Sequence, residues 1–265
     1  MIATLEPDEP ILLRDDRDGI ATLTMNRPAA RNALSAALMS SLEDAFEAIA
    51  KDAGVKVVIL AANGSAFCAG HDLKEMRANP ERQNYEVLFT QCSRLMMAIT
   101  RLSRPVIAKV HATATAAGCQ LIATCDLAVT SDNARFATPG VNIGLFCSTP
   151  MVALSRAIGR KPAMEMLLTG TAVDAAEALR LGLVNRVVAP DALDGATWDL
   201  AVAIAAKSPL TVATGKEAFY RQIELDLDAA YAYASKVMTS NMMAHDAAEG
   251  IDAFLEKRPP KWEGR

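Results

Sequence analysis

Short apolar runs that alternate with helix-like stretches limit the folds open to this chain more than any other feature. Residues 56–61 (KVVILA) and 105–110 (PVIAKV) are too short for typical helices and rich in β-branched side chains, so each predicts a buried strand. Ahead of the first run, Ser35 is a predicted N-cap. Four apolar residues then recur at helical spacing: Leu38, Leu42, Phe46 and Ile49. Strands that alternate with helices indicate an α/β fold.

The stretch 112–126 (ATATAAGCQLIATCD) gives the clearest indication of a functional site. It follows a predicted strand and places Ala116, Ala117 and Gly118 directly before an apolar helical pattern. The first N–H groups of a helix have no partner inside it, and small residues let a ligand approach them. We therefore expect this turn to favour a developing negative charge. Tight packing of the helix on the sheet is the alternative explanation.

The rest of the chain predicts a core followed by a helical region. Residues 70–72 (GHD) form a second tight turn before a helix, and residues 135–140 are expected to form a turn. From Leu193 onward the pattern is almost entirely helical, with expected breaks near Ser208-Pro209 and Gly250. We expect two regions, a core over 1–192 and a helical packing or oligomerisation region over 193–265.

Composition excludes several classes of function. A net charge of −4 and 5% aromatic residues argue against a nucleic-acid partner. No apolar run approaches the roughly 18 residues of a membrane span. Five cysteines without disulfide-framework spacing, and an N-terminus (MIATLEPDEP) unlike a targeting peptide, predict a cytoplasmic location. No motif for a metal or nucleotide cofactor is present.

Four segments resemble, in order and at family spacing, the crotonase (enoyl-CoA hydratase/isomerase) superfamily. They are MNRPAARNALS at 25–35, SAFCAGHDLKEM at 65–76, TAAGCQLIATCDLAV at 115–129 and FATPGVNIGLFCSTP at 136–150. AGHDLKE and TAAGCQL are most similar to the enoyl-CoA hydratase domain-containing protein 3 subgroup. The resemblance implies a crotonase-like spiral of ββα turns with C-terminal helices, assembled as a homotrimer or a dimer of trimers.

The resemblance also implies an acyl-CoA thioester substrate in fatty acid metabolism, with coenzyme A entering as part of the substrate and no separate cofactor. The thioester oxygen would lie between the backbone N–H groups of His71 and Ala117, an oxyanion hole. The family usually has glycine where Ala117 stands and a small side chain where His71 stands. The His71 imidazole is either a pocket-lining group or a general base, and the sequence leaves both open.

The chain departs from the family at the two glutamates of its active hydratases. Gln120 and Gly140 stand there, and neither exchanges a proton near neutral pH. Hydration uses one carboxylate to activate water and another to handle the α-carbon proton, so efficient hydration is not expected. Two hypotheses follow: an enzyme of the lyase or isomerase type with an atypical site, or an acyl-CoA-binding or regulatory protein without chemistry.

Further residues take expected roles from the same resemblance or from their types. Six are expected to contact coenzyme A: Ala29, Arg31, Ala69, Asp72, Leu73 and Lys257. For Arg31 and Lys257 the alternative is an ordinary solvated charge. Five other candidates are expected to be structural or solvated: Glu75, His111, Asp126, Cys147 and His245. Asp72 is also expected to cap the turn that contains it.

Overall fold

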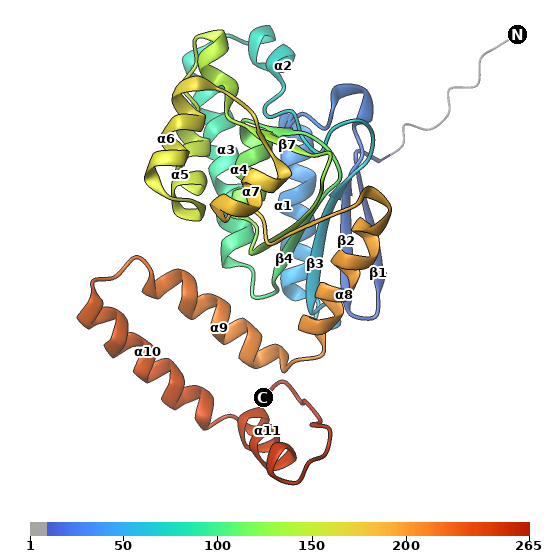
Figure 1. Cartoon of the computed structure of the whole chain (residues 1–265), viewed down its shortest axis with the longest axis vertical. Coiled ribbons are helices and arrows are strands. Elements are labelled where there is room, and N and C mark those ends of the chain that lie inside the picture. Colours follow the sequence, from blue (N-terminus) through green and yellow to red (C-terminus); the bar gives the residue numbers. More distant parts are fainter. Residues whose placement is uncertain (1–9) are drawn as a thin grey trace, which may run out of the picture.

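The structure is a computed structural model that describes residues 10–265, and the targeting expectation drawn from the N-terminus falls on residues outside that range, apart from Pro10. A six-stranded sheet in the order β1-β2-β3-β4-β6-β9 runs through the molecule (Figure 1). Its strands are β1 Leu12–Arg17, β2 Ile20–Met25, β3 Val57–Ala62, β4 Val106–Val110, β6 Leu127–Ser131 and β9 Arg186–Val188. Only the β1–β2 pair of this sheet is antiparallel. The α/β class expected from the sequence is confirmed.

A second, three-stranded sheet corrects one expectation. It has the order β5-β7-β8 and consists of β5 Ala114–Thr115, β7 Arg135–Ala137 and β8 Val173–Asp174. Residues 135–140, expected as a turn, therefore begin with a strand and continue as the short helix η2 Pro139–Ile143. Strands of two or three residues are too short to show the alternation by which a strand is recognised in a sequence.

Helices cover the sheets and form the C-terminal third. In chain order they are η1 Pro28–Ala30, α1 Ala36–Lys51, α2 Leu73–Ala78, α3 Arg82–Arg101, α4 Ala117–Thr124, α5 Ser148–Ala157, α6 Arg160–Thr169, α7 Ala175–Leu181, η3 Pro190–Ala192, α8 Leu193–Ala205, α9 Pro209–Gln222, α10 Leu227–Met242 and α11 His245–Leu255. The expected break at Gly250 is wrong, because Gly250 lies inside α11. The missing side chain at Gly250 lets the Trp262 ring pack closely against the helix, since a Cβ there would come to 3.1 Å from that ring.

The apolar stripe predicted on the first helix faces the core. Ser35 caps α1 by accepting a hydrogen bond from the Leu38 N–H at 3.2 Å, and the four apolar residues at helical spacing are all buried. Helix α8 covers the other face of the sheet and packs on Ile20, Ile59 and Ile107. Both faces of the parallel strands are thus buried, as their continuous apolar runs require.

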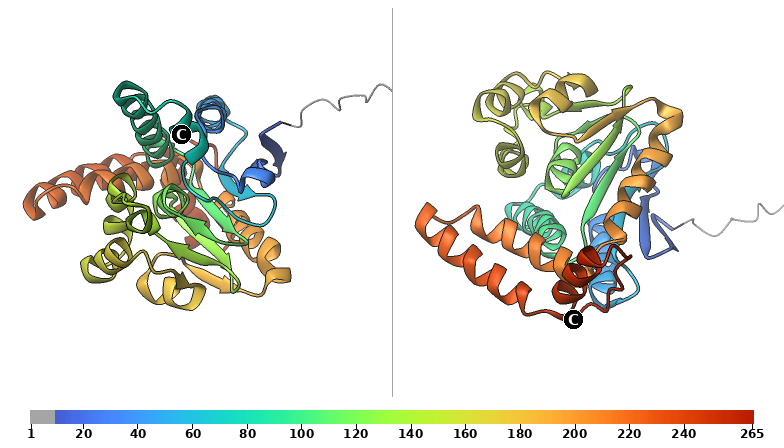
Figure 2. Two further views of the ribbon diagram at one scale, coloured as in Figure 1. Left: turned by 90° about the horizontal axis from the view of Figure 1, so that it is seen from above. Right: turned by 60° about the horizontal axis from the view of Figure 1, so that its bottom comes forward.

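Helices α9 and α10 form a hairpin that projects from the core (Figures 1 and 2). A buried ion pair fixes α9, because the Lys216 Nζ lies 2.6 Å from the Asp126 Oδ2. The Tyr220 hydroxyl donates to the other oxygen of Asp126 at 2.9 Å. Whether residues 193–265 form a separate unit stays a prediction, since α8 packs on the sheet whereas α9 to α11 extend away from it.

Candidate functional site

The first element of the site is a short backbone ladder between residues 31–34 and 69–72. The Leu34 N–H donates to the Gly70 carbonyl at 2.7 Å, and the Asp72 N–H donates to the Leu34 carbonyl at 3.3 Å. This parallel pairing skips the N–H of His71, which donates to no group within residues 10–265. The ladder therefore fixes the His71 backbone and leaves its amide without a partner among the described residues.

The second element is the N-terminus of α4. Ala116 has φ 50° and ψ −118°, a conformation that L-residues with a side chain rarely adopt, and its N–H donates to the Ala137 carbonyl at 2.9 Å. The next amide, that of Ala117, has no hydrogen-bond partner in the part of the chain that the structure describes. As the first residue of a helix, Ala117 presents an N–H that favours negative charge.

The two elements lie against each other. A Cβ placed on Gly70 would come to 2.9 Å from the Ala116 Cβ and 3.4 Å from the Ala117 nitrogen. A Cβ on Gly118 would come to 2.2 Å from the Cys68 carbonyl, so only glycine permits this approach. Close packing, one of the two explanations of the small residues, is therefore true of this turn, whereas binding of a negative charge there stays a prediction. Joint use of the two amides by one oxygen stays a prediction.

Two residues that the sequence did not single out hold this arrangement. Asn32 is fully buried at φ 52°, and its Nδ2 donates to the carbonyls of Asn63 at 2.7 Å and Ala66 at 2.9 Å. The Arg27 guanidinium lies 3.1 Å from the Asp72 carboxylate. Asparagine tolerates the left-handed region better than most residues, but its long-range partners leave no trace in the sequence.

The His71 side chain occupies an enclosed position. Both ring nitrogens are buried and neither has a hydrogen-bond partner in residues 10–265. The ring meets the Phe89 ring edge to face, with centroids 5.5 Å apart. Burial lowers the pKa of the imidazole below its usual value, and an interaction with the Leu34 backbone offsets part of that shift. The imidazole is therefore neutral at pH 7, with one donor and one acceptor nitrogen.

A cavity of about 660 Å³ opens on one face of α3. Its lining comes from Arg82, Tyr85, Glu86, Phe89, Thr90 and Ser93. Phe89 belongs both to this lining and to the contact with His71, whereas His71 itself does not line the cavity.

Neither position of the usual glutamates offers a proton-transfer group. Gln120 is buried in α4, where its Oε1 accepts a long hydrogen bond of 3.9 Å from the Cys92 thiol. Gly140 is also buried, and a Cβ there would come to 2.5 Å from the Leu145 carbonyl and 2.9 Å from the Cys147 sulfur. The chain's own loop thus fills the space in which a side chain at position 140 would begin.

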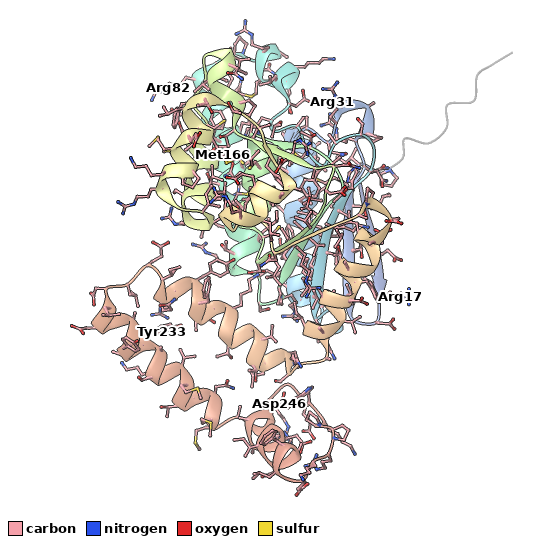
Figure 3. All side chains as sticks on the ribbon, viewed as in Figure 1. Arg17, Arg31, Arg82, Met166, Tyr233 and Asp246 are labelled. Atoms are coloured by element: carbon pink, nitrogen blue, oxygen red, sulfur yellow. The ribbon has the colours of Figure 1, made fainter. Side chains whose placement is uncertain are left out.

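Five of the six residues expected to contact coenzyme A lie together. The Ala69 N–H donates to the Arg31 carbonyl at 3.0 Å, and Arg31 has an exposed guanidinium with no partner within residues 10–265. Leu73 and Ala29 are also exposed. Lys257 lies two residues beyond the end of α11, and Figure 3 shows Asp246 of α11 and Arg31 at opposite ends of the molecule. The contacts with coenzyme A stay predictions, and within one chain Lys257 is apart from the rest.

The contacts of the remaining candidate residues indicate structural roles. The Asp72 carboxylate caps α2, as expected, by accepting from the Lys74 N–H at 3.2 Å. Asp126 anchors α9, and the Glu75 carboxylate accepts from the Ala36 N–H at the start of α1 at 3.1 Å. Burial raises the pKa of the Cys147 thiol. His111 bonds the carbonyl of Gly64 through its Nε2 at 2.8 Å, and His245 lies beside Asp246 in α11.

Two kinds of feature are missing from the described chain. Within residues 10–265, no three or more His, Cys, Asp or Glu side chains gather in a way that could hold a metal ion. Over the same residues, no helix combines the length and the apolar character needed to cross a bilayer.

Comparison with known proteins identifies the relatives of this chain. The model of the enoyl-CoA hydratase/isomerase family matches residues 15–265. A mouse protein named enoyl-CoA hydratase domain-containing protein 3, mitochondrial, is 47% identical over 93% of this chain and 82% of its own length. The crystal structure of the human protein of that name matches with a TM-score of 0.92 and 45% identity, covering 96% of this chain and all of the other.

A bacterial structure is similar over the same range. An enoyl-CoA hydratase from Mycobacterium smegmatis matches with a TM-score of 0.94 and 59% identity, covering 96% of this chain and 99% of the other. The family, the subgroup and the crotonase fold expected from the sequence are confirmed by these matches.

The cytoplasmic expectation is contradicted. The relatives of the same name in mouse, rat, frog, human and zebrafish are all described as mitochondrial. The physical reason is that reduced, buried cysteines indicate only a reducing environment, and more than one compartment provides that. All five cysteines here are free and buried, so they do not discriminate between such compartments.

Proposed function

Since this chain belongs to the enoyl-CoA hydratase/isomerase family, we propose that it binds a fatty acyl- or enoyl-CoA thioester and acts on it through the backbone amides of His71 and Ala117. The observation that carries the proposal is the pair of unused N–H groups on two backbone segments in contact. Donors fixed in advance at the position of a developing oxyanion contribute about 10²–10³ in rate each. Both donors here belong to the main chain, so they are fixed before any ligand arrives.

The step that these donors support is polarisation of the thioester carbonyl. An enolate forms when the α-carbon gives its proton to solvent water, because positions 120 and 140 carry no base. The negative charge then lies on the carbonyl oxygen, where the two amides and the N-terminus of α4 stabilise it. Hydration by two carboxylates is not part of the proposal, because Gln120 and Gly140 supply neither acid nor base. The product is therefore expected to form slowly, or by a different fate of the enolate.

The coenzyme A portion would lie over the exposed residues beside the ladder. Arg31 suits a phosphate, because its guanidinium is exposed and has no partner within residues 10–265. Lys257 would reach the same coenzyme A only from a neighbouring copy, which fits a homotrimer or dimer of trimers. The α9–α10 hairpin supports such an assembly through its exposed apolar side chains: Phe219, Ile223, Leu227, Tyr231, Met238 and Met242.

A second candidate is a protein that binds acyl-CoA without converting it. The loss of both glutamates favours it, as does the loop that occupies the space beside Gly140. This candidate shares the proposed binding site and differs only in chemistry.

The experiment compares the wild type with His71→Ala and His71→Pro. His71→Ala removes the imidazole and keeps the backbone N–H, whereas His71→Pro removes both. Binding of crotonyl-CoA is followed by calorimetry, turnover by loss of the enoyl absorbance, and enolisation by deuterium uptake at the α-carbon of butyryl-CoA. We expect His71→Pro to lose at least about tenfold relative to His71→Ala in whichever activity the wild type shows.

The outcomes separate the candidates. Binding with turnover or deuterium uptake supports the enzyme, and binding with neither supports the binding protein. Equal behaviour of folded His71→Pro and His71→Ala contradicts the oxyanion role, and the absence of binding across thioesters of several chain lengths contradicts both candidates.

A further inference from the structure

A second cavity, of about 360 Å³, lies at the edge of the main sheet where its parallel strands begin. It is lined by residues within 53–56, which lead into β3, by residues 103–104, which lead into β4, and by the α8–α9 junction and the C-terminal tail. The proposed donors His71 and Ala117 follow the other ends of these two strands. The six residues of β3 span about 17 Å, so this cavity is separate from the proposed thioester site.

The lining of this cavity has an excess of positive charge. Three cationic side chains, Lys56, Arg104 and Lys207, stand against one carboxylate, that of Glu263. Within residues 10–265 none of the three cations forms an ion pair, whereas the Glu263 carboxylate is paired with Arg265 at 2.8 Å. Two positive charges are therefore left uncompensated by the residues that line the cavity.

The Arg104 guanidinium is fixed in the wall by neutral groups. Its Nε donates to the Val55 carbonyl at 3.1 Å, its Nη2 donates to the Asp52 carbonyl at 3.0 Å, and its Nη1 donates to the Ser103 hydroxyl. A guanidinium has five N–H groups, so two remain for a ligand. A half-buried guanidinium with spare donors and no carboxylate partner suits the oxygens of a phosphate group.

Much of the remaining wall is apolar, including Ile204, Leu210 and Val212. We propose that the cavity is a second binding site, which takes a phosphate monoester with a small apolar body. Such a group carries about two negative charges near pH 7, which matches the excess of the lining, whereas a monocarboxylate carries one. The volume lies at the small end of ligand pockets, which are about 300–1,000 Å³. The site is independent of the proposed function.

The test uses phenyl phosphate as the probe and measures its dissociation constant by calorimetry at pH 7.5 and fixed ionic strength. Inorganic phosphate lacks the apolar body, benzyl alcohol lacks the charge, and benzoate carries only one charge. Each comparison compound thus loses part of what the cavity offers. We expect the full-length wild type to bind phenyl phosphate at least about tenfold more tightly than any of the three.

Variants assign the binding to the cavity. Lys56→Gln/Lys207→Gln removes two exposed cations of the lining and should weaken binding about tenfold. Its matched control is Lys161→Gln/Lys236→Gln, which removes the same charge from exposed positions on α6 and α10 and should bind as the wild type does. Ala213→Phe keeps all three cations but fills the cavity, so it should also lose at least about tenfold. Circular dichroism checks that each variant is folded.

Arg31→Gln separates this site from the one proposed for coenzyme A, and it should leave the affinity for phenyl phosphate unchanged. Weaker binding in Arg31→Gln but not in Lys56→Gln/Lys207→Gln would place the probe at the coenzyme A site and overturn the inference. Equal weakening in the two lysine double variants would show attraction by net charge alone and would also overturn it. A wild type that does not bind phenyl phosphate refutes the inference and leaves the proposed function in place.

Discussion

Replacing Gly140 by alanine should destabilise the protein although the change adds a single methyl group. The added Cβ would come to 2.5 Å from the Leu145 carbonyl oxygen and 2.9 Å from the Cys147 sulfur. The closer neighbour is backbone, so the loop over 141–147 has to move. Overpacking of this kind costs about 1–3 kcal/mol. For a chain of this size that corresponds to about 2–4 °C in melting temperature per kcal/mol.

Gly195→Ala is the matched control. Gly195 lies inside α8, and a Cβ there would meet nothing within 4 Å. Alanine is the better helix former, so this variant should gain about 0.5–1 kcal/mol. Thermal unfolding followed by circular dichroism at one protein concentration compares both variants with the wild type. A Gly140→Ala protein as stable as Gly195→Ala would show that the loop yields freely and that the clash argument is wrong.

The same geometry bears on any attempt to place the two glutamates of the family's active hydratases in this chain. A glutamate at position 140 cannot simply be added, because its first side-chain carbon already collides with the loop. We expect Gln120→Glu/Gly140→Glu to unfold at a lower temperature than Gln120→Glu alone. Hydration of crotonyl-CoA by the double variant would require the loop at 141–147 to have moved, and a structure of that variant would show it.

Three further predictions concern the side chains of Lys216, His71 and Cys68. Lys216→Met leaves the buried Asp126 without its cation and should cost about 3–5 kcal/mol in urea unfolding; Arg156→Met, which breaks an exposed pair, should cost less than about 1 kcal/mol, and equal losses would refute the distinction. The pKa of His71 is lowered by burial, so the unfolded chain binds its proton first as the pH falls below about 6.5. Wild-type stability should therefore decline there relative to His71→Phe, by up to about 1.4 kcal/mol per pH unit, and parallel stability profiles would contradict this. Burial raises the pKa of Cys68 to about 12, so iodoacetamide at pH 8 should label it only in denaturant, as mass spectrometry would show.

The parts of the fold that could be predicted from the sequence are those that local residue patterns encode. Residues 56–61 and 105–110 are strands because β-branched apolar runs suit a sheet covered on both faces. The helix after Ser35 follows from its cap and from the spacing of its apolar residues. The helix break predicted near Gly250 was wrong, because the Trp262 ring, which follows α11, packs against this glycine. A glycine used for close packing and a glycine that ends a helix look the same in a sequence.

In the candidate site too, some features could be predicted from the sequence and others could not. The two turns at 70–72 and 116–118 were predictable because small residues precede helices at both. Their contact, the bracing by Asn32 and the filled space at Gly140 were not, because each joins segments far apart in the chain. The unpartnered nitrogens of His71 belong to this group too: no pattern in a sequence states what a side chain fails to touch.

At the ladder between residues 31–34 and 69–72, hydrogen-bond donation and selectivity are separate properties of residue 71, whereas in most sites one side chain provides both. The ladder positions an N–H at residue 71 whatever side chain that residue bears, so mutation there can alter selectivity without removing the donor. The same holds for Ala117, whose N–H depends on the start of α4. In evolutionary terms, the two amide donors that we propose for thioester binding can persist while the side chains at positions 71, 120 and 140 change.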